Sequence, residues 1–87
     1  MVKGTVTITN KSGLHARPAS VFVKETLKYK SAISIVINGK EYNAKSILGV
    51  LAACAKTGTE IEIICNGEDE EEALKGMIAI VESGLGE

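Results

Sequence analysis

The chain has few aromatic residues, no tryptophan and almost no net charge. Phe22, Tyr29 and Tyr42 are the only aromatic side chains among 87 residues, and the formal net charge is −1. Three aromatic rings are too few to stack against successive nucleic-acid bases. A net charge of −1 also argues against nucleic acid or an anionic membrane as a partner. We therefore expect neither of these to be the main partner.

Histidine and proline each occur once, and cysteine occurs twice. Cys54 and Cys65 have neither the CxxC spacing nor the histidines of a zinc site, so we expect no metal and no cofactor. Apolar runs stop well short of the roughly 20 residues that span a bilayer, and no signal-peptide pattern precedes the first strand. The expected location is cytoplasmic, with reduced thiols. A Cys54–Cys65 disulfide is the less favoured alternative.

Local patterns predict a single domain over residues 1–87. Residues 2–8, 32–37 and 60–65 alternate with the period of half-buried strands, and residues 40–43 are expected to form a short strand after a hairpin turn. Asn38-Gly39 matches a two-residue hairpin turn, in which both residues take positive φ. The order β-α-β-β-α-β-α predicts two interleaved split βαβ units. The expected fold class is α+β, an open-faced sandwich whose four-stranded, mostly antiparallel sheet carries three helices on one face.

Helical spacing predicts which side chains face the core. Inward positions are Ala19, Phe22, Val23, Thr26 and Leu27 in the first helix, Ile47, Val50, Leu51 and Cys54 in the second, and Ala73, Leu74, Met77, Ile78 and Val81 in the third. Leu48 is out of phase and should be exposed. Ser46 is a good N-cap for the second helix, and Gly58 is the predicted stop. The acidic run 68–72 fits a first helical turn better than a metal site.

The only histidine lies where a strand pattern ends and a helix pattern begins. Pro18 is tolerated only in the first turn of a helix, so the helix begins at about Ala16 and His15 lies at or next to the N-cap. Free N–H groups of Ala16 and Arg17 favour an anion there, and the Arg17 guanidinium can hold two phosphate oxygens. This pattern predicts that His15 carries or transfers a phosphoryl group. The alternative is an ordinary exposed N-cap histidine.

The sequence lacks the other parts of a phosphoryl-transfer enzyme. It has no second histidine, no P-loop pattern and no acidic cluster with the spacing of a magnesium site. A phosphoryl acceptor without a nucleotide site is most simply a carrier that other proteins load and unload. We therefore expect a non-enzyme that does not turn over a substrate alone.

Two motifs resemble those of one known family. Residues 13–19 (GLHARPA) resemble the active-site signature of the histidine-containing phosphocarrier family, HPr, of the bacterial phosphoenolpyruvate-dependent sugar phosphotransferase system. Residues 45–50 (KSILGV) resemble the regulatory serine segment of its Gram-positive members. The resemblance covers the whole chain. Three residues depart from the family pattern: Cys54 replaces a usual glycine, and Leu48 and Leu51 replace common methionines.

The resemblance implies a place in a relay. His15 would accept a phosphoryl group at Nδ1 from phosphorylated enzyme I, with Arg17 and the Ala16 N–H as phosphate contacts, and pass it to enzyme IIA proteins. HPr kinase/phosphorylase would phosphorylate Ser46 with ATP, slowing this transfer and making the protein a corepressor with the catabolite control protein. A monomer is implied. The implied docking residues are Leu48, Ile47, Leu51, Ser20 and Lys24.

Three other functions remain open from the residues. A regulatory HPr paralogue devoted to catabolite repression fits less well, because that class lacks the active-site histidine. A nitrogen-branch relative matches the context of Ser46 less closely. A small enzyme that uses His15 as a general base has no substrate-pocket pattern to support it.

Overall fold

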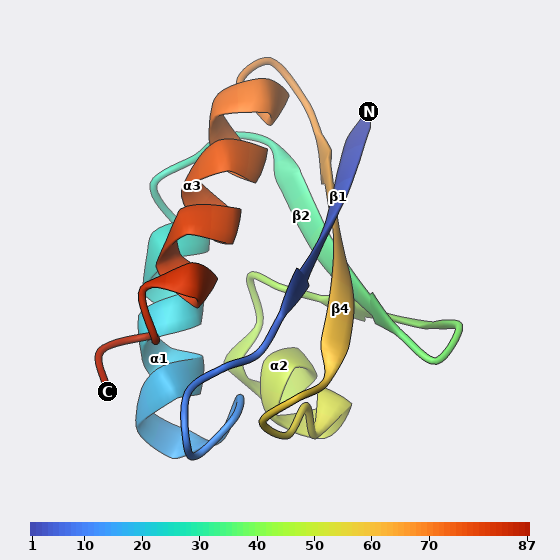
Figure 1. Ribbon diagram of the computed structural model, residues 1–87. Helices are drawn as coiled ribbons and strands as arrows, with labels where there is room; N and C mark the ends of the chain where they lie inside the picture. The colour runs from blue at the N-terminus through green and yellow to red at the C-terminus, as the bar shows by residue number, and fades with distance from the viewer.

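The computed structural model describes residues 1–87. Its seven elements follow the predicted order: β1 (Val2–Thr7), α1 (Ala16–Thr26), β2 (Ala32–Ile37), β3 (Lys40–Asn43), α2 (Ile47–Ala53), β4 (Glu60–Asn66) and α3 (Glu70–Glu82). The strands are ordered β1-β4-β2-β3, and every neighbouring pair is antiparallel. Because β4 lies between β1 and β2, and β2 lies between β3 and β4, the two split βαβ units are confirmed. The helices lie on one side of the sheet, so the open-faced sandwich is confirmed (Figure 1).

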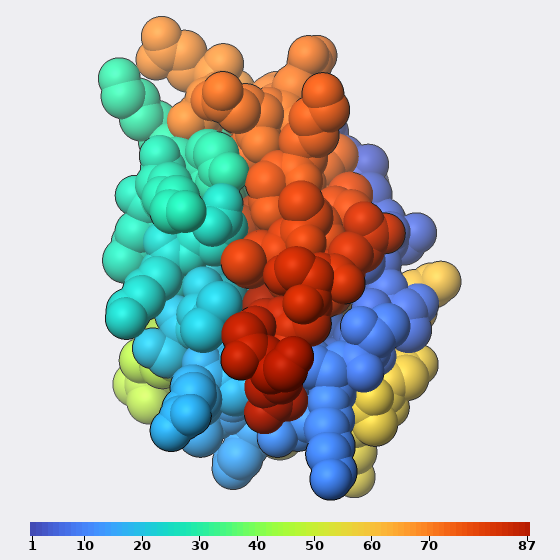
Figure 2. All heavy atoms as spheres, turned by 60° about the vertical axis from the view of Figure 1, so that its left-hand side comes forward, coloured from blue at the N-terminus to red at the C-terminus, as the bar shows by residue number.

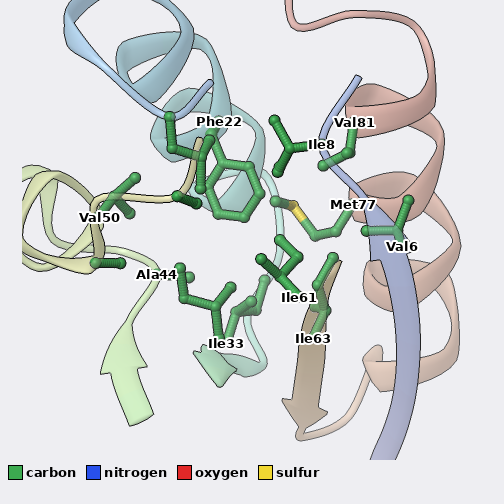
Figure 3. Close-up of a cluster of buried hydrophobic side chains, with 14 of the residues drawn as sticks. Val6, Ile8, Phe22, Ile33, Ala44, Val50, Ile61, Ile63, Met77 and Val81 are labelled. Atoms are coloured by element: carbon green, nitrogen blue, oxygen red, sulfur yellow. The ribbon is translucent and has the colours of Figure 1, made fainter. Parts of the chain in front are cut away.

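The core lies between the sheet and the helices. Alternate residues of β2 and β4 point into it, and all are buried: Ile33, Ile35, Ile37, Ile61, Ile63 and Cys65. Figure 3 shows Phe22 of α1, Val50 of α2 and Met77 of α3 meeting above these strands. Each such side chain stabilises the fold by about 1.5–3 kcal/mol relative to exposure. The core therefore holds α1 and α2 against the sheet, and His15 and Ser46 lie at the starts of these two helices. None of the helices has the length and apolarity to cross a membrane.

Some predicted inward positions are wrong. Leu27 is 64% exposed, because α1 ends at Thr26 and the chain turns away from the core. Ile47 and Cys54 are exposed, because α2 has only seven residues and buries Val50 and Ala53. The predicted exposure of Leu48 is confirmed.

The predicted helix stop at Gly58 is also wrong. α2 ends at Ala53, and Cys54 takes the left-handed conformation (φ 52°, ψ 38°) with its N–H donated to the Leu51 carbonyl at 3.2 Å. Gly58 lies in the next turn, where its N–H donates to the carbonyl of Ile8 at 2.7 Å. Ile8 donates in turn to Thr59 at 2.8 Å, which continues the pairing of β1 with β4 and buries Ile8 beyond the end of the strand.

Both the hairpin turn and the glycine within α3 have a structural reason. Asn38 and Gly39 have φ values of 52° and 79°, as predicted for the β2–β3 turn. Gly76 gives room to Tyr29, because a Cβ at residue 76 would collide with the tyrosine hydroxyl. That hydroxyl donates to Glu25 at 2.8 Å, and burial together with the Glu25 carboxylate raises the pKa of Tyr29 to about 12. Gly76 thus permits the close approach of α1 and α3.

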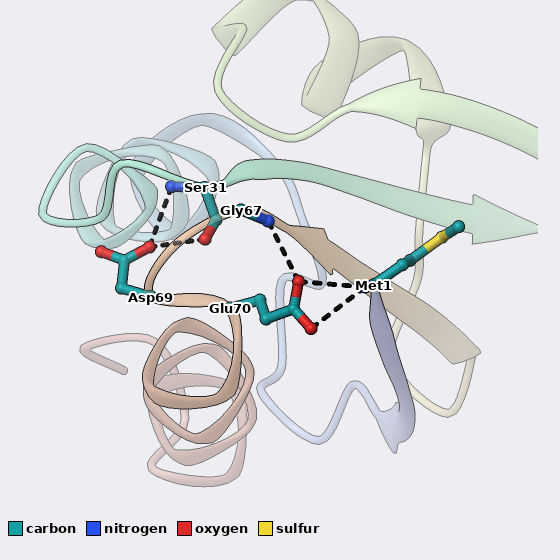
Figure 4. A network of polar contacts seen from close by, with 5 residues as sticks. All are labelled: Met1, Ser31, Gly67, Asp69 and Glu70. Atoms are coloured by element: carbon teal, nitrogen blue, oxygen red, sulfur yellow. Dashed lines mark hydrogen bonds and ion pairs between the residues drawn. The ribbon is translucent and has the colours of Figure 1, made fainter.

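The turn between β4 and α3 is held by two carboxylates (Figure 4). Asp69 accepts the N–H groups of Lys30 and Ser31, both at 2.9 Å, and the Ser31 hydroxyl. Glu70 accepts the Met1 ammonium at 3.0 Å and the Gly67 N–H at 3.1 Å. Glu70, Glu71 and Glu72 of the acidic run lie in the first turn of α3, as predicted, whereas Asp69 is the N-cap residue and Glu68 precedes the helix.

Asp69 makes the fold sensitive to acid. Its pKa falls from 3.8 to about 2, chiefly because the Ser31 hydroxyl and the Lys30 N–H donate to the carboxylate. Since the folded pKa lies below the unfolded one, this stabilisation is complete above about pH 4 and is lost as the pH falls toward 2. Asp69→Asn should lower the urea midpoint at pH 7, and the gap from wild type should close toward pH 2. Glu68→Gln, at an exposed residue whose side chain forms no hydrogen bond, is the control. A gap that is as wide at pH 2 as at pH 7 would contradict the assignment.

Cys54 strains the end of α2. A non-glycine residue in the left-handed region costs roughly 1–2 kcal/mol, whereas glycine adopts it freely. We expect Cys54→Gly to raise the free energy of unfolding by about 1 kcal/mol, measured by urea denaturation. Cys54→Ala is the matched control, because it removes the thiol and keeps the Cβ. Equal gains in both variants would show that the thiol, and not the backbone, is responsible.

Candidate functional site

His15 begins α1 as its N-cap residue. Its backbone is extended (φ −123°, ψ 153°), its side chain is exposed, and the ring makes no capping hydrogen bond. The His15 carbonyl accepts the Ala19 N–H at 3.3 Å. Pro18 lies within the first turn, where the sequence placed it. The imidazole is therefore free to react with a group that approaches from solvent.

The start of α1 offers unpaired hydrogen-bond donors beside this ring. No hydrogen bond is found on the N–H groups of Ala16 and Arg17, and the exposed Arg17 guanidinium forms no ion pair. Ala16 has φ +30°, an unusual value for a residue with a Cβ, and such strain costs on the order of 1–3 kcal/mol. An anion attached to His15 would meet two backbone donors and a guanidinium at the positive end of the helix dipole.

The loop before His15 packs against the segment that follows α2. Leu14 is 1% exposed, and its N–H donates to the Ala55 carbonyl at 2.7 Å. Gly13 has φ +64°, and a Cβ there would collide with the same carbonyl and lie 2.9 Å from the Cα of Lys56. Glycine at residue 13 thus allows the two segments to touch. This contact sets the start of α1 beside the end of α2.

Asn10 and Glu87 hold the other side of this loop. Asn10 is 5% exposed, and its Nδ2 donates to the Gly13 carbonyl at 2.9 Å and to Oε1 of Glu87 at 3.0 Å. Ser12 donates its N–H to Oε1 of Glu87 at 3.0 Å and its hydroxyl to Oε2 at 2.8 Å. Bonds from Asn10 and Ser12, together with the charge of Arg17, hold the pKa of Glu87 below its usual value.

Sequence reasoning missed Asn10 and Glu87 as parts of the site. Residues 10–13 have the composition of a turn, which by itself predicts no further role for Asn10. Glu87 lies 75 residues from Ser12 in the chain, and no local pattern marks a contact of that separation. Only the folded tail after α3 brings the carboxylate to the loop.

Ser46 is the N-cap of α2, as predicted. Its Oγ accepts the Gly49 N–H at 3.1 Å, and its side chain is half-buried. Gly49 permits the first turn of α2 to approach β3, since a Cβ there would lie 2.7 Å from the Asn43 carbonyl oxygen. The Ser46 oxygen is thus held at the head of a second helix.

The predicted docking residues lie on α1 and α2, which pack against one another. Leu48 is 76% exposed and Ile47 is 41% exposed, an unusual degree of exposure for large apolar side chains. Lys24 on α1 is exposed, whereas Ser20 and Leu51 are half-buried. We refer to these five residues as the docking surface. Both cysteines are unpaired, with Cys54 exposed and Cys65 buried.

Comparisons with known proteins agree on one family. The family model described as "PTS HPr component phosphorylation site" matches residues 2–83. The phosphocarrier protein HPr of Mycoplasma capricolum is 49% identical over 77 residues, which cover 88% of this chain and 86% of the relative. The HPr-like protein Crh of Bacillus subtilis is 44% identical over 82 residues, covering 94% and 96%.

Solved structures give the same result. HPr-C-His from Thermoanaerobacter tengcongensis matches with a TM-score of 0.96 at 41% identity and covers 100% of this chain and 98% of its own. HPr from Bacillus anthracis matches with a TM-score of 0.86 at 42% identity, covering 90% and 93%. These matches confirm the resemblance carried by residues 13–19. The chain belongs to the HPr family, the phosphocarriers of the bacterial phosphotransferase system.

Proposed function

We propose that His15 accepts a phosphoryl group at Nδ1 from phosphorylated enzyme I and passes it to a histidine of sugar-specific enzyme IIA proteins. The observation that supports this most is the exposed imidazole beside two backbone N–H groups that have no partner. Such donors cannot rotate away, so they are ready for phosphate oxygens before any arrive. The protein is a carrier in this relay and completes no reaction alone.

The transfer exchanges one phosphorus–nitrogen bond for another. The lone pair of His15 Nδ1 attacks phosphorus as the bond to the donor histidine breaks, and the electron pair of that bond returns to the donor nitrogen. Little covalent chemistry is left for the protein, so positioning and charge stabilisation dominate. The N–H groups of Ala16 and Arg17 and the Arg17 guanidinium hold the three oxygens. Because nucleophile and leaving group are both imidazoles, the group can move on to the next protein.

The charge of the segment that carries His15 and Ser46 favours acidic partners. Segment 8–59, which includes α1 and α2, carries eight lysines and arginines against two glutamates, whereas segment 60–87 carries nine aspartates and glutamates against one lysine. A net charge of −1 thus hides a basic segment of the sequence, which contains both His15 and Ser46. Leu48 and Ile47 serve as apolar anchors, and Lys24 steers the encounter. A monomer remains the prediction for this chain; a dimer is described for HPr of Thermoanaerobacter tengcongensis.

Ser46 is the regulatory site of this proposal. HPr kinase/phosphorylase transfers the γ-phosphoryl group of ATP to its Oγ. The phosphate adds a charge of about −2 at the head of α2, where the helix dipole accommodates it. It therefore leaves the fold intact and repels acidic partners from the docking surface. The modified form also acts as a corepressor with the catabolite control protein, in keeping with a Bacillus subtilis relative described as "Catabolite Repression HPr".

His15 is tested with radiolabelled phosphoenolpyruvate and enzyme I. We expect acid-labile label on the wild-type protein and none on His15→Ala. Circular dichroism should be unchanged in this variant, because the exposed ring makes no capping bond. Arg17→Lys should still be labelled, about tenfold more slowly, a loss of roughly 1.4 kcal/mol of transition-state stabilisation. Label retained in His15→Ala would refute the carrier assignment.

Two substitutions of Ser46, by Asp and by the isosteric Asn, test the effect of the phosphate charge. Asp and Asn both cap a helix well, but only Asp adds charge. We expect Ser46→Asp to slow the phosphorylation of His15 by enzyme I, on the order of tenfold, and Ser46→Asn to react as fast as wild type. Neither variant should accept phosphate from ATP and the kinase. Equal rates for the two variants, or ATP labelling that survives in them, would overturn the regulatory role.

A further inference from the structure

We propose that Glu87 is a positioning residue of the phosphoryl-transfer site, whose side-chain carboxylate holds the loop of residues 10–14 in the shape that places His15 at the start of α1. The kinetic consequence rests on the proposed function, whereas the hold on the loop stands independently of it.

Both oxygens of the Glu87 carboxylate accept hydrogen bonds from the loop. Its two oxygens accept three hydrogen bonds of 2.8–3.0 Å from Asn10 and Ser12. A surface glutamate normally gains little from one exposed contact, whereas three convergent bonds to a charged acceptor fix a geometry. Two of the donors belong to Ser12, three residues before His15. The carboxylate therefore acts on the backbone that leads directly to the reactive ring.

The chain after α3 is folded so that it brings this carboxylate to the loop. Leu85 is fully buried with φ +53°, and its N–H donates to the Ile80 carbonyl at 3.2 Å. Glu87 donates its own N–H to the Gly84 carbonyl at 3.0 Å. Figure 2 shows this C-terminal segment, in red, lying between α1 and the blue N-terminal segment. A buried leucine in a strained backbone conformation anchors the tail, so Glu87 is presented from a fixed support.

Without the Glu87 carboxylate, the loop would keep only part of its hydrogen bonds. Gly13 still donates to the Asn10 carbonyl at 3.2 Å, and Leu14 still donates to Ala55 at 2.7 Å. Neither of these bonds involves Ser12, whose N–H and hydroxyl have no other partner. Asn10, whose buried Oδ1 is already without a partner, would lose one of its two donor contacts. The loop would then be held on the α2 side alone.

One cation faces the carboxylate across this loop. Hydrogen bonds from the neutral Asn10 and Ser12 groups of the loop lower the pKa of Glu87, and the charge of Arg17, from α1, lowers it further. Lys11, the charged side chain of this loop, is exposed. Since the folded pKa is depressed, the hold is present above the ordinary pKa of 4.5 and is lost as the pH falls through the lower folded value. The contacts of Glu87 with Asn10 and Ser12 should therefore weaken in acid, whereas contacts made by packing alone would not depend on pH in this way.

Nuclear magnetic resonance tests the hold directly in the full chain. In wild type, the Ser12 amide and the Asn10 side-chain amide signals should titrate together with a midpoint below 4.5. That titration should vanish in Glu87→Gln, while in Glu87→Ala the Gly13 and Leu14 amides should exchange with solvent about tenfold faster. Glu82→Gln, at an exposed residue of α3 without a hydrogen bond, should match wild type. A Ser12 titration that survives in Glu87→Gln, or unchanged exchange in Glu87→Ala, overturns the hold.

Enzyme kinetics test the positioning. For phosphorylated enzyme I acting on Glu87→Ala, we expect kcat to fall on the order of tenfold and KM to stay within about twofold, because the ring is displaced while the docking surface is intact. Glu87→Gln, which keeps one acceptor oxygen, should lie between wild type and Glu87→Ala. Unchanged kcat in Glu87→Ala, despite faster loop exchange, overturns the positioning role. If wild-type protein takes no phosphoryl group at all, the proposed function fails, and the resonance experiment still decides the hold.

Discussion

The site depends on one close approach, between the loop before α1 and the segment after α2. The Leu14 N–H donates to the Ala55 carbonyl at 2.7 Å, and the absence of a Cβ at Gly13 is what lets the two backbones meet. These segments lie about 40 residues apart in the chain, and each immediately adjoins a helix end. A side chain at residue 13 would push them apart and move the start of α1. The positions of His15 and of α2, which carries Ser46, are therefore coupled through this contact.

Two residues near the same contact have strained backbone conformations. Ala16 (φ +30°) and Cys54 (φ +52°) both hold backbone conformations that disfavour a Cβ, at roughly 1–2 kcal/mol each. Burial of Leu14 offsets such a cost, since a leucine withdrawn from water contributes about 1.5–3 kcal/mol. Strained residues persist only where the surrounding structure over-determines them. Here the core, the Ala55 contact and the Glu87 contacts together define the loop.

Local rules predicted the parts of this arrangement that local chemistry controls. Strand alternation, the Asn38-Gly39 turn and the placement of Pro18 each depend on neighbouring residues, and they led to the correct fold and the correct helix start. The end of α2 was mispredicted because Gly58 is a stronger helix-stop signal than Cys54, whose left-handed conformation nothing in its own sequence requires. Glu87 was missed because its role exists only after Leu85 packs into the core. Sequence patterns therefore placed His15 at a helix start and did not reveal the contacts of Glu87 with the loop before it.

The exposure of His15 suits the carrier role that we propose for it, for a physical reason. A buried site would bind its group strongly but admit few partners, whereas His15 lies at the surface, on a helix end that proteins of different shape can approach. Exposure weakens every electrostatic contact, so stabilisation has to come from donors that cost no reorganisation, such as the backbone N–H groups of Ala16 and Arg17. Water leaves only when a partner docks, and the same contacts then strengthen as the local dielectric falls. Transfer is thus favoured in the complex over the free carrier, provided that the loop before His15 keeps its shape while the partner binds.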